Sequence, residues 1–228
     1  MTIDQRINGL DVTLYNAIES QSSHCDKEDW LGVQRIIRHK PGGYTYLEIG
    51  SHLGGSIQPH LLDPLCKQIV SVDARPLQCP DDREQKFVKY TGNSTKRMME
   101  NLNNLAPEHV DKVTCVEGSG RDLTPQIFTQ PPTFCLIDGE HTHGAAFADF
   151  LSCMRVCAPD AVICFHDAQV IIPALRDALH HLNMQGRRFH ARKMREYNFM
   201  IFLGNHIFAA DQWLLNASSN GQAWLAED

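Results

Sequence analysis

Five short apolar runs, each followed at once by glycine or polar residues, most restrict how this 228-residue chain can fold. Segments with the hydrophobic spacing of helices separate these runs. Strands that alternate with helices in this way form a mostly parallel sheet with helices on both faces. The predicted strands are residues 44–49, 69–72, 113–116, 134–137 and 161–165.

The rest of the pattern predicts helices and two closing strands. Segments 187–192 and 197–203 are expected to complete the sheet. The first forty residues show only helical spacing, so we expect a helical extension at 1–40 followed by one α/β domain at 41–228. Further helices are predicted at residues 56–66, 95–105, 145–156 and 172–182, and residues 74–92 are expected to form a long loop with a short strand at 87–88.

The composition matches that of an ordinary globular domain and excludes several other classes of protein. Hydrophobic residues make up 43% and charged residues 21%, which excludes disorder, collagen and a coiled coil. The 27 acidic against 21 basic residues give a net charge of −6. This excess argues against nucleic acid or an anionic membrane surface as the partner. No run approaches the about 20 apolar residues of a membrane span.

Eight cysteines raise the question of disulfides. None belongs to a C-x-x-C pair, which weakens a zinc or thioredoxin-type interpretation. Cys115, Cys135 and Cys164 lie within apolar runs, where free cysteine packs as a small hydrophobic residue. The first ten residues lack the pattern of a signal peptide. We therefore expect reduced thiols and a cytoplasmic location.

The first two predicted strands end in residues that suit a nucleoside ligand. Residues 48–56 read E-x-G-x-x-x-G-x-S, and glycines at such a turn let the backbone and its amides approach a ligand. Asp73 ends the next strand, where a carboxylate can accept hydrogen bonds from both ribose hydroxyls. Each feature alone could be an ordinary turn or a helix cap, but together they favour a nucleoside.

These segments resemble the class I S-adenosylmethionine-dependent methyltransferases. The resemblance rests on Y-L-E-I-G at 46–50, V-S-V-D at 70–73 and E-G-S at 117–119, and extends over about residues 44–203. It implies a Rossmann-like, doubly wound sheet of seven mostly parallel strands with a closing antiparallel strand. In that family the glycine turn holds the methionine end of the cofactor, the acid holds the ribose, and residues after the third strand lie near adenine. The cofactor-binding residues so implied are Glu48, Gly50, Ser51, Gly54, Ser56, Asp73, Gly118, Ser119 and Asp138.

The second half resembles a narrower branch, the methyltransferase 24-like small-molecule and sugar O-methyltransferases. The segments concerned are L-I-D-G-E-H-T-H at 136–143 and I-C-F-H-D-A at 163–168. The resemblance implies methyl transfer from S-adenosylmethionine to a hydroxyl of a small-molecule acceptor, such as a sugar or polyol, with no nucleic-acid or membrane partner. It leaves open whether the protein is a homo-oligomer. Several members of the branch bind magnesium.

The same strand ends offer a metal site and a base. Asp138 and Asp167 close neighbouring predicted strands, so both carboxylates can face one cleft. Such oxygen donors suit Mg²⁺, which would lower the pKa of a bound hydroxyl. His166 is a third candidate ligand, although it could equally support a ligand from behind. His141, three residues beyond Asp138, is the candidate catalytic base.

Other interpretations use the same residues. Strand-end aspartates often cap helices, and His141 could be an exposed loop residue. His141, His166 and one aspartate would also satisfy the two-histidine, one-carboxylate iron site of an oxygenase-type hydroxylase. A third hypothesis is a non-catalytic module that only binds the cofactor. Iron-dependent oxygen uptake would indicate the hydroxylase, and cofactor binding without an acceptor or metal response would indicate the module.

Overall fold

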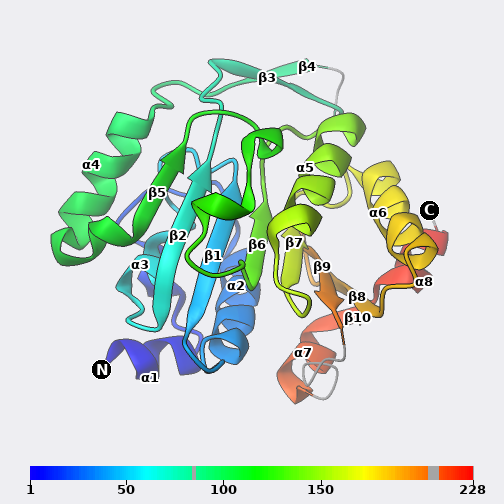
Figure 1. Cartoon of the computed structure of the whole chain (residues 1–228), viewed down its shortest axis with the longest axis horizontal. Coiled ribbons are helices and arrows are strands. Elements are labelled where there is room, and N and C mark those ends of the chain that lie inside the picture. The colour runs from blue at the N-terminus through cyan, green and yellow to red at the C-terminus, as the bar shows by residue number, and fades with distance from the viewer. Residues whose placement is uncertain (84–85, 205–210, 228) are drawn as a thin grey trace.

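A largely parallel β-sheet runs through the centre of the molecule, as the alternating pattern predicts (Figure 1). The protein is described by a computed structural model that covers residues 1–83, 86–204 and 211–227. The strands hydrogen-bond in the order β10–β8–β9–β7–β6–β1–β2–β5. They are β1 Tyr44–Ile49, β2 Cys66–Val72, β5 Val113–Val116, β6 Phe134–Ile137, β7 Val162–Phe165, β8 Phe189–Met194, β9 Phe199–Leu203 and β10 Ser218–Asn220.

The expected fold class is confirmed, with one strand more than predicted. Strands β5, β2, β1, β6 and β7 pair in parallel, and β9 pairs antiparallel with both β7 and β8. The eighth strand is β10, three residues that pair antiparallel with the outer edge of β8. Residues 218–220 read Ser-Ser-Asn, so no apolar alternation marks them as a strand.

The register of the parallel strands brings their carboxyl ends to one level. Ile49 of β1 lies opposite Val72 of β2 on one side and Ile137 of β6 on the other. Ile137 in turn lies opposite Phe165 of β7, and Val72 lies opposite Val116 of β5. The residues that follow these five therefore share one edge of the sheet, as expected for an open α/β sheet with a ligand site.

Helices cover both faces of the sheet because alternate strand residues point to opposite sides. On β6, Phe134 and Leu136 join a core with α1–α4 and α7, whereas Cys135 and Ile137 join a core with α5, α6 and α8. Figure 1 shows α5, α6 and α8 together on one side of the fold. The helices are α1 Ile3–Asn8, α2 His24–Ile37, α3 Gln58–Leu62, α4 Thr95–Leu105, α5 His143–Val156, α6 Ile172–Met184, α7 Gln212–Ala217 and α8 Gly221–Glu227. Short 3₁₀ turns are η1 Val12–Tyr15, η2 Pro107–Lys112, η3 Gly120–Asp122 and η4 Pro125–Ile127.

The helix at 95–105 agrees with the prediction to the residue, but the helix expected at 56–66 is shorter. Only Gln58–Leu62 is helical, since the chain turns at Asp63 and β2 already begins at Cys66. The first forty residues form α1, η1 and α2, with Gly9 capping the end of α1.

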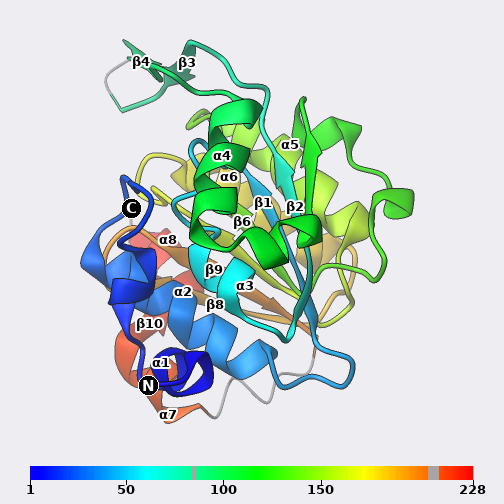
Figure 2. The same cartoon turned by 90° about the vertical axis from the view of Figure 1, so that its left-hand side faces the viewer.

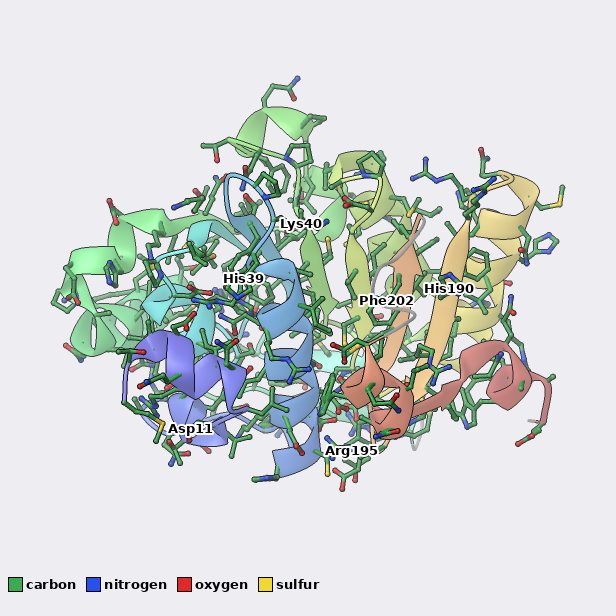
Figure 3. All side chains as sticks on the ribbon, turned by 90° about the horizontal axis from the view of Figure 1, so that it is seen from below. Asp11, His39, Lys40, His190, Arg195 and Phe202 are labelled. Atoms are coloured by element: carbon green, nitrogen blue, oxygen red, sulfur yellow. The ribbon has the colours of Figure 1, made fainter. Side chains whose placement is uncertain are left out.

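Helix α2 is built into the core beside the end of β7. The indole of Trp30, 1% exposed, donates from Nε1 to Asn198 Oδ1 at 3.0 Å. Figure 3 shows Arg195 at one end of α2, and His39 and Lys40 at the other. Arg195 Nη2 contacts Glu28 at 2.8 Å and Asp29 at 3.0 Å. The N-terminal end of α2 is thereby fixed to the segment that joins β8 to β9.

Residues 74–92, expected to be a loop with a short strand, contain a two-stranded hairpin. It consists of β3 Gln78–Asp81 and β4 Lys86–Lys89, paired antiparallel. Figure 2 shows that this hairpin projects beyond the rest of the fold. In Figure 1 it lies above the edge at which β2 and β5 end.

The expectation of reduced thiols agrees with the structure. All eight cysteines are free thiols. A search of the described residues for a helix long and apolar enough to cross a membrane finds none.

We expect Asp63→Ala to destabilise the fold by about 3–5 kcal/mol, because it leaves the buried guanidinium of Arg38 with only the exposed carboxylate of Asp4 as a partner. Arg38 of α2 makes two hydrogen bonds to Asp63, at 2.9 and 2.8 Å, and both side chains are at most 1% exposed. The matched control is Asp160→Ala, which breaks an exposed pair with Lys40 and should cost less than about 1 kcal/mol. Urea unfolding measures both, and equal costs would contradict the structural role of Asp63.

Candidate active site

The carboxyl ends of the parallel strands open into a cavity of about 920 Å³. This volume lies in the range of about 300–1,000 Å³ that is usual for ligand pockets. Gly54 lies outside the cavity lining and packs against α4, with Met98 Cγ only 3.1 Å from where a Cβ would be. The other predicted site residues all line the cavity: Glu48, Gly50, Ser51, Ser56, Asp73, Gly118, Ser119, Asp138, His141, His166 and Asp167.

Gly50 allows the loops after β1 and β6 to touch. It has φ +95°, a conformation that favours glycine, and its amide donates to the carbonyl of Val72 at 2.8 Å. A Cβ at this position would lie 2.1 Å from the carbonyl oxygen of Asp138. Any other residue would therefore push the two loops apart and change the floor of the cavity.

Glu48 lies at the base of the cavity with its carboxyl group almost completely buried. The Tyr46 hydroxyl donates to it at 2.9 Å, and the Ser56 hydroxyl donates to its other oxygen. Burial raises the pKa of Glu48 to about 8, and the charge of Asp138 adds to this effect. Glu48 thus ties the strand end to the turn as a neutral, hydrogen-bonded acid at pH 7.

Asp73 presents a fixed carboxylate at the end of β2. The backbone amides of His52 and Arg75 donate to its two oxygens, at 3.0 and 2.7 Å. The Arg75 guanidinium adds a contact at 3.1 Å. Because each carboxylate oxygen can accept more than one hydrogen bond, Asp73 still has acceptor capacity toward the cavity.

A buried acid that sequence reasoning did not identify faces the loop after β5. Asp149 of α5 lines the cavity opposite Gly118 and Ser119, and the backbone amide of Gly120 donates to it. Burial raises the pKa of Asp149 to about 7. In the sequence, Asp149 lies in the middle of an amphipathic helix, where an acidic residue is normally exposed.

Four residues from the ends of β6 and β7 converge in the cavity. One donor atom each from Asp138, His141, His166 and Asp167 lies within 4.8 Å of the others. Nδ1 of His166 is 2.9 Å from Asp138 Oδ1, and Nε2 of His141 is 3.3 Å from Asp167 Oδ2. Asp167 adopts φ +51°, a left-handed conformation that aspartate tolerates better than most residues. The expectation that these residues face one cleft agrees with the structure.

The ring nitrogen of each histidine that points away from Asp138 and Asp167 contacts a further carboxylate. Nε2 of His166 lies 3.2 Å from Asp26 Oδ2, and Nδ1 of His141 lies 3.2 Å from Asp81 Oδ2. Asp26 belongs to α2 and Asp81 to β3, so both come from segments distant in the chain. Each imidazole is therefore anchored through one nitrogen and directs the other toward the two strand-end carboxylates.

The β3–β4 hairpin closes over this group through Arg83. Nη2 of Arg83 lies 2.9 Å from Asp81 Oδ2 and 3.1 Å from Asp167 Oδ2. The backbone of the hairpin is joined to the loop after β6, since the Asp82 amide donates to the His141 carbonyl at 3.0 Å. The His143 amide donates back to the Asp82 carboxylate at 3.0 Å.

The charges of this group shift one another's protonation. Burial opposes ionisation of Asp138, but the neighbouring His166 and His141 hold its pKa well below the ordinary value. Burial likewise opposes charge on the histidines, but Asp138 and the other carboxylates raise the pKa of His141 and, more strongly, that of His166. The group is thus a compact set of paired charges, in which either protons on the histidines or a bound cation can balance the two carboxylates.

The donor chemistry of the group fits a divalent metal ion. Two aspartate oxygens and an imidazole nitrogen from adjacent strand ends are ordinary metal ligands. The histidine nitrogens that point away from the centre are bonded to carboxylates, as is usual for metal-binding histidines. Asp138, His166 and Asp167 are the residues that would hold such an ion.

One part of the cavity wall is polar and comes from two other segments. Residues 19–22, between η1 and α2, contribute Glu-Ser-Gln-Ser. Gln169 and the 41%-exposed Tyr197 line the side next to His166. This wall offers hydrogen-bond donors and acceptors to a second molecule beside the strand ends.

Comparison with known proteins identifies a matching family and similar folds. A family model described as a methyltransferase domain matches residues 47–168. Calicheamicin methyltransferase CalS11 superposes with a TM-score of 0.58 and 16% identity, covering 89% of this chain and 92% of its own. The O-methyltransferase TomG of Streptomyces achromogenes, solved with S-adenosylmethionine, gives 0.56 and 14%, covering 89% and 90%. MycE methyltransferase, solved with Mg, S-adenosylhomocysteine and mycinamycin VI, gives 0.56 and 11%, covering 87% and 54%.

At these identities the structural likenesses establish a shared fold. Comparison of the sequence with proteins of curated function finds no match.

The wild type should lose stability as the pH rises from about 5 to about 8, and we expect Glu48→Gln to make this loss smaller. Unfolded, Glu48 ionises near its ordinary pKa of 4.5, whereas folded it stays protonated until about pH 8. Its contribution to stability therefore falls as pH rises between these values, by up to about 1.4 kcal/mol per pH unit. Urea unfolding of both proteins at about pH 5 and about pH 8 measures the difference. An equal loss of stability in E48Q would mean that Glu48 is ionised in the folded protein.

Proposed function

The chain belongs to the methyltransferase domain family, whose model matches residues 47–168 of its 228, and from this premise we propose its reaction. It is the transfer of the methyl group of S-adenosylmethionine to a hydroxyl of a small, polar acceptor such as a sugar or polyol. The observation on which this depends most is that Asp138, His141 and Asp167 meet in the same cavity as the glycine turn and Asp73.

The cofactor half of the proposal is supported by the turn after β1 and the acid after β2. The fixed carboxylate of Asp73 is suited to accept hydrogen bonds from the two ribose hydroxyls. The backbone of Gly50 and Ser51 lines the part of the cavity that we assign to the methionine end of S-adenosylmethionine. Gly118 and Ser119 then border the region for adenine, and Asp149 can accept a hydrogen bond from an exocyclic amine there.

The acceptor half is supported by the polar wall beside His166. Residues 19–22, Gln169 and Tyr197 offer hydroxyl, amide and carboxylate groups, which match the many hydroxyls of a sugar or polyol. An apolar acceptor would displace water from these groups without replacing its hydrogen bonds, at a cost in affinity.

In the proposed mechanism the neutral form of His141 removes the proton of the acceptor hydroxyl. Against the effect of burial, the carboxylates beside His141 raise its pKa, and a cation at Asp138 and Asp167 would offset their charge and so favour this neutral form. Asp81 holds Nδ1, so Nε2 faces the strand-end carboxylates at 3.3–3.4 Å. The acceptor oxygen forms a bond to the methyl carbon, the carbon–sulfur bond breaks, and the sulfonium becomes the neutral thioether of S-adenosylhomocysteine. The proton ends on His141. The chain's main contribution is to align oxygen, carbon and sulfur.

A divalent metal at Asp138, His166 and Asp167 would make the acceptor hydroxyl more acidic when bound. The sequence predicts Mg²⁺ in this role, and MycE, whose fold is similar, was solved with Mg. These residues would also orient two neighbouring hydroxyls of an acceptor beside the methyl group.

The rival hydroxylase is favoured by one observation, the convergence of two histidines with Asp138. It leaves the Gly50 turn and Asp73 without a use. Oxygen uptake by the iron-loaded protein would support it. A lack of any methyl transfer despite cofactor binding would support the non-catalytic module.

We expect His141→Ala and Asp138→Ala to abolish methyl transfer and to leave binding of S-adenosylhomocysteine largely intact. The resemblance also places Asp138 near the cofactor, but the proposed roles of both residues are toward the acceptor. Calorimetric cofactor affinity should therefore change by less than about tenfold, while turnover falls by at least about a hundredfold. Turnover is followed with labelled S-adenosylmethionine and a panel of hexoses, inositols and catechols.

His143→Ala is the matched control for His141→Ala. His143 lies two residues further on, is half exposed and pairs with Asp177 outside the cavity lining. It should retain wild-type turnover. Full activity in both H141A and D138A would refute the assigned roles, and failure of the wild type to bind S-adenosylhomocysteine would refute the proposed function.

A further inference from the structure

His166 supplies an imidazole nitrogen at a position where a carboxylate would complete an all-oxygen metal site. We infer that His166 Nδ1, Asp138 and Asp167 form a divalent-metal site that selects cations with affinity for nitrogen, such as Fe²⁺, Co²⁺ and Zn²⁺, over Mg²⁺. This inference rests on the proposed function of the same cavity and specifies the metal that it uses.

The three donors are held by the sheet itself. Asp138 follows β6, and His166 and Asp167 follow β7, the strand paired in register with it. In an octahedral site with metal–ligand distances of about 2.1 Å, two neighbouring donor atoms lie about 3 Å apart. The 2.9 Å between His166 Nδ1 and Asp138 Oδ1 already has this spacing, and Asp167 Oδ2 lies 3.8 Å from the same nitrogen.

Asp26 determines which nitrogen of His166 faces the site. Asp26 is completely buried, and its Oδ2 lies 3.2 Å from His166 Nε2. The carboxylate is itself fixed by two hydrogen bonds. The backbone amide of Ser23 donates to Oδ2 at 3.0 Å, and the side-chain amide of Asn198 donates to Oδ1 at 3.1 Å. A carboxylate in this position orients a ligating histidine and makes its other nitrogen a better donor.

The rings around His166 oppose its rotation. Trp30 packs against the imidazole with centroids 5.6 Å apart, and Tyr197 lies on another side at 6.2 Å. Trp30 is fixed by its hydrogen bond to Asn198, the same residue that donates to Asp26. One connected set of contacts from α2 and the start of β9 therefore keeps Nδ1 directed at Asp138.

The nitrogen donor decides which cations are favoured. Mg²⁺ prefers oxygen ligands and loses its water reluctantly. Imidazole suits Fe, Ni and Zn, and affinity generally rises from Mn²⁺ through Fe²⁺ and Co²⁺ to Ni²⁺. A site with one imidazole and two carboxylates should therefore discriminate against Mg²⁺ more strongly than the same site with a third carboxylate.

His141 is left to act on the acceptor rather than on the metal. Its support, Asp81, belongs to the hairpin and not to the sheet. Arg83 of the same hairpin contacts Asp167, so a cation competes with this guanidinium. The Arg83 side chain is 45% exposed and keeps Asp81 as a partner, so it can give up its contact with Asp167 Oδ2 when a cation binds there.

The test is calorimetric titration of the chelator-treated full chain with Co²⁺, Zn²⁺ and Mg²⁺, and the same titration of His166→Asp. We expect the wild type to bind Co²⁺ at least about a hundredfold more tightly than Mg²⁺. H166D, with only oxygen donors, should reduce this ratio at least about tenfold. An unchanged ratio, or no Co²⁺ binding by the wild type, overturns the inference.

Asp26→Asn tests the supporting carboxylate, and Asp29→Asn is its matched control. Asp29 is also buried on α2 and bonded to Asn198, but its contacts are to Arg195 and not to His166. D26N should weaken Co²⁺ binding about 10- to 100-fold and alter the Co²⁺ absorption spectrum, whereas D29N should leave both nearly unchanged. Equal losses in both variants would show an effect of packing and overturn the role of Asp26.

Two further measurements separate this inference from the proposed function. His141→Ala should keep the wild-type Co²⁺ affinity, and a large loss would overturn the three-ligand arrangement by making His141 a ligand. S-adenosylhomocysteine is titrated into the wild type without metal. If it binds while Co²⁺ does not, the metal inference fails and the methyl-transfer proposal stands. If it does not bind, the proposed function fails, whatever the metal result.

Discussion

The in-register parallel pairing of β2, β1, β6 and β7 is the constraint on which the rest of the structure depends. It places the residues after these strands, Asp73, Gly50, Asp138 and His166, at one level of one edge. A register slip of one residue would turn each of these side chains to the opposite face. The candidate cofactor-binding residues and the candidate catalytic residues therefore share a single cavity because of the backbone hydrogen bonds between the strands.

Burying so many charged groups at that edge requires partners from outside the sheet. Asp26 of α2 pairs with His166, while Asp81 and Arg83 of the hairpin pair with His141 and Asp167. The N-terminal helices and the hairpin are thus parts of the site and not only of the surrounding structure. Movement of either segment would change the direction of an imidazole, which links the dynamics of these segments to the chemistry.

Local sequence pattern was sufficient for the five parallel strands and for the residues that end them, because burial on both faces makes each of these strands an apolar run followed by a polar residue or glycine. It failed where tertiary contacts decide. Asp26 reads as part of a helix-capping sequence, and its pairing with a histidine 140 residues away has no local signal. Residues 74–92 contain Pro76, Pro80, Asp81 and Asp82 and read as a long loop with a short strand at 87–88. Gly54 matched a motif but packs against α4, since its role depends on the path of the turn.

The proposed reaction moves a methyl group from a sulfonium to an oxygen. Carbon-13 NMR of the protein with S-adenosylmethionine labelled at the methyl carbon, in the presence of hydroxylated acceptors, tests it most directly. If the methyl group moves to a hydroxyl, the sulfonium methyl signal declines while a methoxy signal of the acceptor and S-adenosylhomocysteine appear together. Label that stays on the bound cofactor with every acceptor, or that moves to nitrogen or carbon, would contradict it.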